Sequence, residues 1–203
     1  DNVTIKSENI PWYDGKTLLD YLETVDIKSS DNEKGFYMPV QRVCRPDHTF
    51  RGFQGQVESG EISVGDEVTT LPSNEKAKVK QILVVDKDSK TAKVGQPATI
   101  TLDKEVDVSR GCVLTKDSEI GVYKKLRASL LWMDDNTLTE GTDYLVKLGT
   151  KTIPAIVTKI EYAVDVNTGE HIKKDELNKN EIALCDILLT EPIVVDKFDN
   201  HKT

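Results

Sequence analysis

The chain has 203 residues, with 27 Lys and Arg against 35 Asp and Glu, so its formal net charge is −8. This acidic balance argues against non-specific nucleic-acid binding, which depends on Lys and Arg neutralising phosphate groups. Hydrophobic residues make up 37% of the chain and recur along most of it, which excludes a disordered protein.

Residues 1–35 are expected to form a short helix followed by a linker. The chain begins at Asp1 rather than at an initiator Met, which indicates a piece of a longer protein. We expect Asp14 or Gly15 to cap the start of the helix. The polar run at 29–35 has no periodicity and predicts a flexible joint. The apolar residues of the helix follow the spacing of one stripe: Leu18, Leu19, Leu22 and Val25.

The Gly15-Lys16-Thr17 triplet matches the end of a phosphate-binding P-loop, but its surroundings do not. A P-loop needs a second glycine five residues earlier and a strand before the loop. Position 10 is Ile10, and Pro11 follows it. We therefore reject a nucleotide site here and expect the triplet to begin the helix.

Residues 36–117 are expected to form a first small β-barrel. Between 76 and 85, Ala77, Val79, Leu83 and Val85 share the odd positions, the period-two pattern of a half-buried strand. Four glycines between 52 and 65 indicate bulges or close backbone approach, which a small barrel needs at its corners. The expected strands lie at 38–43 (with Pro39 near its beginning), 50–57, 67–71, 76–85, 98–102 and 112–115.

Residues 120–198 are expected to form a second all-β unit, with strands at 124–133, 143–148, 152–164 and 182–196. In the third of these strands the apolar positions change from odd to even after Val157, which predicts one β-bulge. Residues 165–170 read as a turn and 173–179 as a charged connector. Residues 199–203 form a polar tail.

The cysteines and histidines point to no metal site. Cys44, Cys112 and Cys185 are isolated in apolar surroundings, as expected of small buried side chains in a reducing compartment. With no signal peptide and no apolar run near the roughly 20 residues of a membrane span, this favours a cytoplasmic protein. Three histidines lie in polar, loop-like segments and are expected to be solvated: His48, His171 and His201.

A basic cluster is the candidate site of this sequence. Arg42, Arg45 and Arg51 surround Asp47, and together these four residues are the candidate interface with another domain or a partner. The alternative is a set of salt bridges on the rim of a barrel. The sequence has no G-x-S-x-G, H-E-x-x-H or G-x-G-x-x-G pattern, so we assign it no catalytic, cofactor-binding or metal-binding residue.

The pattern R-G-x-x-G-x-V-x-S-G-x-x-x-V-G-D at 51–66 resembles the second domain of translational GTPases such as elongation factor Tu. The segments 94–98 and 108–114 are similar to the closing strands of that barrel. The family has a second Gly-Asp turn where Gly95-Gln96 stands here, a departure confined to the turn. The resemblance implies an all-β fold with two consecutive small barrels, preceded by a helical remnant of a GTPase domain.

One branch of this superfamily is more similar than the others, the large, GTP-hydrolysing subunit of bacterial sulfate adenylyltransferase. The similar segments are 10–19, 50–53, 71–73 and 131–133. The resemblance implies that a small partner subunit forms adenosine 5′-phosphosulfate from ATP and sulfate while the large subunit hydrolyses GTP. GTP and Mg²⁺ would bind to the preceding GTPase domain, so no cofactor is expected in the 203 residues.

Two alternatives remain open at this point. The barrels could hold tRNA, as in a translation factor, which predicts a basic stripe that Lys76, Lys78 and Lys80 could begin. The chain could also be a free-standing all-β interaction protein, although a helix ending in a linker argues against this. Neither a membrane nor nucleic acid is expected as a partner; the small subunit and the chain's own GTPase domain are.

Overall fold

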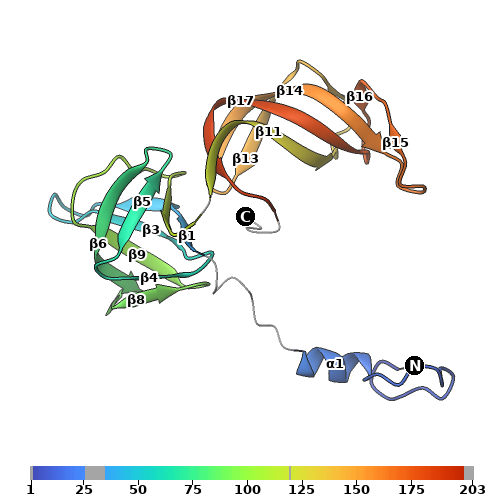
Figure 1. Cartoon of the computed structure of the whole chain (residues 1–203), viewed down its shortest axis with the longest axis horizontal. Coiled ribbons are helices and arrows are strands. Elements are labelled where there is room, and N and C mark those ends of the chain that lie inside the picture. Colours follow the sequence, from blue (N-terminus) through green and yellow to red (C-terminus); the bar gives the residue numbers. More distant parts are fainter. Residues whose placement is uncertain (1, 26–34, 119, 199–203) are drawn as a thin grey trace. The chain divides into compact units, whose positions relative to one another are not determined.

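The computed structural model describes residues 2–25, 35–118 and 120–198 (Figure 1). The chain divides into two compact units, Asp1–Ser30 and Asp31–Thr203. Most of the expected linker at 29–35 and the whole expected tail at 199–203 lie outside the described residues. Within the described residues, no helix combines the length and apolar character that crossing a membrane requires.

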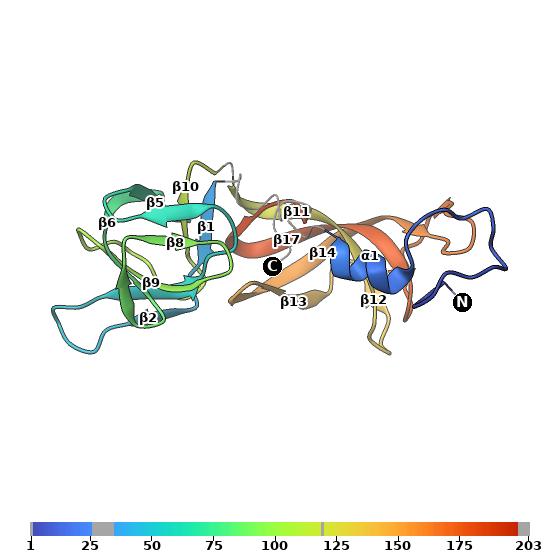
Figure 2. The ribbon, with the colours of Figure 1, turned by 90° about the horizontal axis from the view of Figure 1, so that it is seen from below.

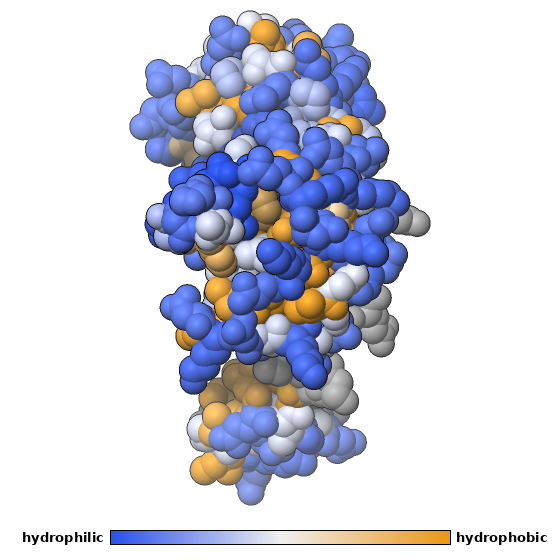
Figure 3. Space-filling model, turned by 90° about the vertical axis from the view of Figure 1, so that its left-hand side faces the viewer, coloured by the Kyte–Doolittle hydropathy of each residue, from blue (hydrophilic) through white to orange (hydrophobic). Residues whose placement is uncertain are grey.

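The first unit contains the helix α1 (Leu18–Thr24). The expected cap at Asp14 or Gly15 is wrong, because Thr17 caps the helix: its Oγ1 accepts a hydrogen bond from the backbone N–H of Asp20 at 3.3 Å. Asp14 lies a full turn too early to reach these amides. None of the helical residues is buried within the unit, and hydrophobic atoms are visible on its surface at the bottom of Figure 3.

Ten antiparallel strands form the first barrel. Seven of them pair in the order β1-β10-β5-β6-β9-β3-β2, β7 joins β6, and β4 pairs with β8. The strands are β1 (Phe36–Pro39), β2 (Arg42–Cys44), β3 (Gly52–Gln56), β4 (Glu61–Ser63), β5 (Glu67–Leu71), β6 (Glu75–Val84), β7 (Lys87–Ser89), β8 (Thr91–Lys93), β9 (Pro97–Leu102) and β10 (Val113–Lys116).

The single strand expected at 38–43 is in fact two, β1 and β2, and Pro39 ends the first rather than beginning it. The chain changes partner between them. The N–H of Val40 donates to the carbonyl of Cys112 at 2.8 Å, and the next N–H, of Gln41, donates to Gln54 at 2.8 Å. A sheet corner therefore replaces a continuous strand.

The alternation expected in β6 holds only for its first half. Ala77 and Val79 are buried, but the pairing with β9 shifts between Val79 and Gln81, so Ile82 rather than Leu83 enters the core. Val85 was wrongly placed in the strand. It lies in the turn to β7 with a φ of 49° and is 72% exposed.

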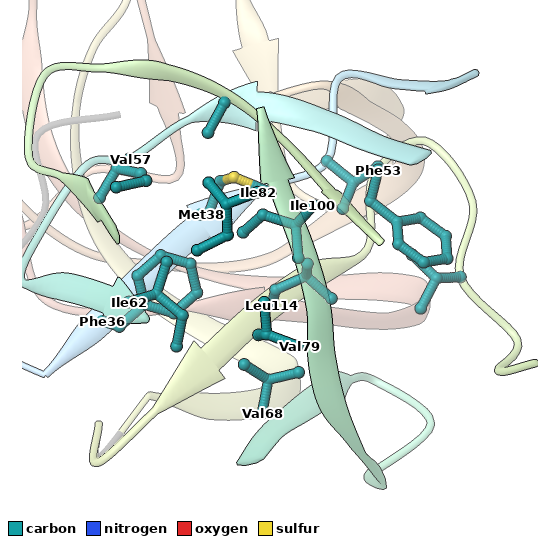
Figure 4. Packing of buried hydrophobic residues seen from close by; sticks show 14 of the residues in the cluster. Phe36, Met38, Phe53, Val57, Ile62, Val68, Val79, Ile82, Ile100 and Leu114 are labelled. Atoms are coloured by element: carbon teal, nitrogen blue, oxygen red, sulfur yellow. The ribbon is translucent and has the colours of Figure 1, made fainter. Parts of the chain in front are cut away.

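The core of the first barrel is apolar. Phe36, Met38 and Ile62 belong to one buried cluster with Ile82 and Ile100 (Figure 4). The close approach expected at the glycines occurs at Gly55, where a Cβ would lie 2.2 Å from the carbonyl oxygen of Pro39.

The second barrel is a curved sheet with the strand order β11-β17-β14-β13, to which β15 adds beside β14, together with the pair β12–β16 (Figures 1 and 2). Its apolar residues form a second core that includes Ile153, Cys185 and Leu189. The strands are β11 (Gly121–Leu131), β12 (Leu138–Thr139), β13 (Asp143–Leu148), β14 (Lys151–Val164), β15 (His171–Ile172), β16 (Glu176–Leu177) and β17 (Ile182–Val195).

The bulge expected in β14 is confirmed, and a second one follows it. Pairing with β17 shifts between Val157 and Lys159, and again between Ile160 and Tyr162, so Ala163 rather than Tyr162 is buried. The turn at 165–170 is also confirmed, closed by a bond from the N–H of Asp165 to the carbonyl of Glu170. The expected charged connector at 173–179 is wrong in one respect: it contains β16, whose Leu177 is fully buried.

The two barrels share a small seam within the second compact unit. Tyr37, Leu71 and Val113 from the first barrel form one buried apolar cluster with Val194 from the second. The Thr150 hydroxyl also donates to the carbonyl of Val40 at 3.1 Å. Apolar packing and a directed hydrogen bond therefore join the barrels.

Candidate partner-binding groove on the first barrel

The loop between β2 and β3 is built around Asp47. One carboxylate oxygen of Asp47 accepts from the Thr49 hydroxyl at 2.6 Å, from the Thr49 N–H at 2.7 Å and from the Phe50 N–H at 3.1 Å. These bonds, with the Thr49 hydroxyl first, lower the pKa of Asp47. Its carboxylate therefore folds the loop, and the loop sets where the neighbouring arginines lie.

Arg51 is held in place by uncharged partners. Its Nη2 donates to the carbonyl of Val108 at 3.0 Å, and its guanidinium carbon lies 5.3 Å from the centre of the Phe53 ring. Both contacts orient the planar guanidinium without neutralising it. The positive charge of Arg51 is therefore positioned in advance.

Arg45 instead forms the rim salt bridge that was the alternative. Its Nη2 lies 2.8 Å from Glu105, and the two side chains are 51% and 79% exposed. Exposed pairs of this kind add little stability. Arg42 lies on β2 opposite Gln54, and the groove is formed without it. The structure thus brings Arg45, Asp47 and Arg51 together and separates Arg42 from them.

A groove of about 280 Å³ lies beside this loop and is also lined by the middle of β6 and the end of β9. Arg45, His48 and Arg51 line it from the loop, Lys80 from β6, and Lys104 from the segment after β9. The sequence pattern did not indicate Lys104 as a site residue, and it indicated Lys80 only as part of a possible basic stripe. Their positions depend on the β6–β9 pairing, which no local pattern reveals.

Positive charge is the uncompensated charge in this groove. Its lining holds four Arg and Lys side chains against two carboxylates: Glu105 is paired with Arg45, and Asp103 keeps its charge while accepting from the N–H of Lys78 at 2.8 Å. The floor adds an unusual polar group. Thr101 is 7% exposed, and its hydroxyl has no hydrogen-bond partner. A buried hydroxyl without a partner costs free energy, and its burial keeps it out of reach of a molecule in the groove.

The cysteines and the remaining histidines offer no chemistry. Cys185 is fully buried, and burial raises the pKa of its thiol to about 11. His171 lies in β15 rather than in a loop and stacks on Tyr162 with ring centres 3.7 Å apart. His201 lies outside the described residues. In the described part of the chain, no three His, Cys, Asp or Glu side chains cluster as metal ligands.

Comparison with known proteins identifies the relatives of this chain. The family model described as GTP-eEF1A C-terminal domain-like matches residues 125–203. Sulfate adenylyltransferase subunit 1 of Saccharophagus degradans is 43% identical over 203 residues, and that of Teredinibacter turnerae is 45% identical over 203 residues. Both alignments include the whole chain.

The chain is homologous to sulfate adenylyltransferase subunit 1. It spans 43% of the length of these two relatives. Both barrels lie within the aligned part of sulfate adenylyltransferase subunit 1, as does the groove.

This chain is also similar in fold to solved structures of translation factors. Sup35 complexed with GDP aligns with a TM-score of 0.78 at 20% identity, over 100% of this chain and 51% of Sup35. The elongation factor SelB of Methanococcus maripaludis aligns with a TM-score of 0.66 at 23% identity, over 88% of this chain and 40% of SelB. The translation-factor-like all-β fold is thereby confirmed.

Proposed function

We propose that this chain supplies the two C-terminal barrels of the GTP-hydrolysing subunit of a sulfate adenylyltransferase. The enzyme would form adenosine 5′-phosphosulfate and pyrophosphate from ATP and sulfate, through a smaller catalytic subunit. The observation that carries the proposal is the 43–45% identity to subunit 1 proteins along all 203 residues. Residues 36–117 and 120–198 would be the barrels, and residues 1–35 the end of the GTPase domain with its linker.

In this proposal the barrels transmit the state of the GTPase domain to the catalytic subunit. A sulfate–phosphate anhydride is unfavourable to form, and coupling its synthesis to GTP hydrolysis needs a switching domain and rigid bodies that report the state of that domain. The apolar seam and the Thr150–Val40 hydrogen bond support this role, because they join the barrels. A rotation of one barrel would then carry the other with it.

GTP and Mg²⁺ would bind outside this chain. The residues present do not fit them: Thr17 of the Gly15-Lys16-Thr17 triplet caps α1, and the described residues contain no cluster of metal ligands. We therefore assign no step of GTP hydrolysis to these 203 residues. The chain alone should show no GTP turnover above a buffer blank, and appreciable turnover would contradict the proposal.

The tRNA-binding alternative gains no support as a second function. The likenesses to Sup35 and SelB concern the fold, at 20% and 23% identity. Of the three lysines that could begin a basic stripe, Lys76 is paired with Glu67 at 3.0 Å.

Grafting the chain into subunit 1 of Teredinibacter turnerae, in place of the aligned segment, tests the proposed function. The graft should restore formation of adenosine 5′-phosphosulfate, and a folded but inactive graft would count against it.

A further inference from the structure

The groove on the first barrel differs in charge from the rest of the molecule. The chain has a net charge of −8, yet the groove gathers Arg45, Arg51, Lys80 and Lys104. Of the two carboxylates in its lining, Glu105 is paired with Arg45, whereas Asp103 accepts from a backbone N–H and keeps its negative charge. An approaching anion therefore meets Arg51, Lys80 and Lys104 against the one unpaired charge of Asp103, so positive charge remains in excess.

The form of the groove favours part of a protein over a small molecule. Its lining is mainly polar, whereas small-molecule pockets are mainly apolar. A few carboxylate side chains on an extended segment fit an open, charged groove of this size.

The preset position of Arg51 strengthens this reading. A guanidinium that is already oriented by Val108 and Phe53 loses little side-chain entropy when a carboxylate binds it. Its planar donors match the two oxygens of a carboxylate.

Nucleic acid fits the groove less well. Strong binding of a nucleic-acid backbone uses about 6–10 phosphate contacts. The groove supplies four Arg and Lys side chains, one of them paired with Glu105, on a chain that is acidic overall. The expected partner is therefore an acidic peptide segment.

We propose that this groove binds an acidic segment of the second subunit of the enzyme, through Arg51, Lys80 and Lys104. The identity of the partner rests on the proposed function; the preference for carboxylates rests on the groove alone. Arg45 lies at the rim of the groove, where it is paired with Glu105, and is not among the residues proposed to bind the segment.

Binding of two probes to the 203-residue chain tests this proposal. The first is a fluorescein-labelled hexaglutamate peptide, and the second is the purified second subunit from the same organism. The test variant is Lys80→Gln with Lys104→Gln, two exposed residues whose loss should leave the fold intact. The matched control is Lys147→Gln with Lys173→Gln, exposed residues of the second barrel that change the net charge equally.

The test variant should weaken binding of both probes about tenfold and the control less than about twofold, and added salt should weaken wild-type binding. Equal losses in both variants, or no hexaglutamate binding to the wild type, would show that the groove does not bind carboxylates.

If the wild type binds hexaglutamate but not the second subunit, the proposed partner is wrong while the carboxylate preference stands. If the second subunit binds all variants equally, the proposed function stands, but the groove is not the site that binds this subunit. Tighter binding of single-stranded poly(U) RNA than of hexaglutamate would replace the acidic segment with nucleic acid.

Discussion

Arg127 of β11 and Asp186 of β17 lie opposite each other on adjacent antiparallel strands and are joined by two hydrogen bonds, from Nε to Oδ1 at 2.6 Å and from Nη2 to Oδ2 at 3.0 Å. Asp186 is 6% exposed, and Arg127 also bonds Glu161 at 2.7 Å. The hydrogen bonds from Arg127 lower the pKa of Asp186 against the opposing effect of burial. This ion pair therefore links the neighbouring strands β11 and β17 through their side chains, in addition to the backbone hydrogen bonds of the sheet.

The Asp186→Asn substitution should lower the melting temperature of the chain by several degrees, because it removes a bidentate charged pair. The matched variant Glu161→Gln should cost less, since Arg127 keeps both bonds to Asp186. Thermal unfolding followed by circular dichroism measures both. Equal losses of melting temperature in the two variants would show that the bidentate pair stabilises the protein no more than the contact with Glu161 does.

The same pair predicts how stability depends on pH. Since the folded-state pKa of Asp186 lies below the unfolded value of about 3.9, the stabilisation is complete above that value and is lost as the pH falls through the folded pKa. The difference in melting temperature between wild type and Asp186→Asn should stay constant from neutral pH down to about pH 5. It should shrink below about pH 4. A difference that persists there would contradict the assignment.

Val85 should be a site where a substitution stabilises the protein. It occupies the turn between β6 and β7 with a φ of 49°, next to Asp86 with a φ of 62°. A β-branched residue in this left-handed region costs about 1 kcal/mol or more, whereas Asn tolerates it. Val85→Asn should therefore raise the free energy of unfolding in urea by about 1 kcal/mol. Val64→Asn, at an exposed valine without a positive φ, is the control and should give no such gain.

Gly55 should tolerate no side chain. A Cβ there would lie 2.2 Å from the carbonyl oxygen of Pro39, and a backbone atom cannot rotate away as a side chain can. Gly55→Ala should lower the free energy of unfolding by about 3 kcal/mol, measured in urea. Gln56→Ala, at the exposed neighbouring residue of β3, should change it by less than about 0.5 kcal/mol. Similar losses at both positions would argue against the close approach.

Cys185 should resist alkylation in the folded protein. Its thiol is buried and its pKa is raised to about 11, so little thiolate forms at pH 8, while Cys44 and Cys112 are partly exposed. Mass spectrometry after iodoacetamide treatment should find Cys44 and Cys112 modified and Cys185 intact. All three should react in denaturant. Rapid modification of Cys185 without denaturant would mean that the second core opens readily.

Much of the strand pattern could be predicted from local sequence. β5 and β13 have the expected bounds of 67–71 and 143–148, and the parity change after Val157 located a real bulge. Period-two patterns predict these strands correctly because one face of each strand is buried and the other faces solvent.

The errors occur where tertiary pairing overrides the local pattern. β1 and β2 look like one strand until the partner changes from β10 to β3 at Val40 and Gln41. Val85 is apolar yet lies in a turn, and Leu177 is buried inside a charged segment. Short strands such as β12 and β16 contain too few residues to show a period at all.

The candidate site was predictable only in part for the same reason. Arg45, Asp47 and Arg51 are close in sequence, so their clustering in one loop could be foreseen. Lys104 comes from the segment after β9 and reaches the groove through strand pairing. The orphan hydroxyl of Thr101 has no sequence signature, because it depends on what the folded barrel places around it.

The most direct measurement of the proposed function is the GTP dependence of the grafted enzyme. In the Teredinibacter turnerae graft, the rate of adenosine 5′-phosphosulfate formation is measured with GTP and with a non-hydrolysable GTP analogue. A control graft carries the barrels of SelB, which share the fold but not the sequence. We predict that GTP stimulates the graft bearing this chain as much as it stimulates the unmodified enzyme measured alongside, and that it does not stimulate the SelB graft. Equal stimulation in both grafts, or none in either folded graft, would contradict the coupling role.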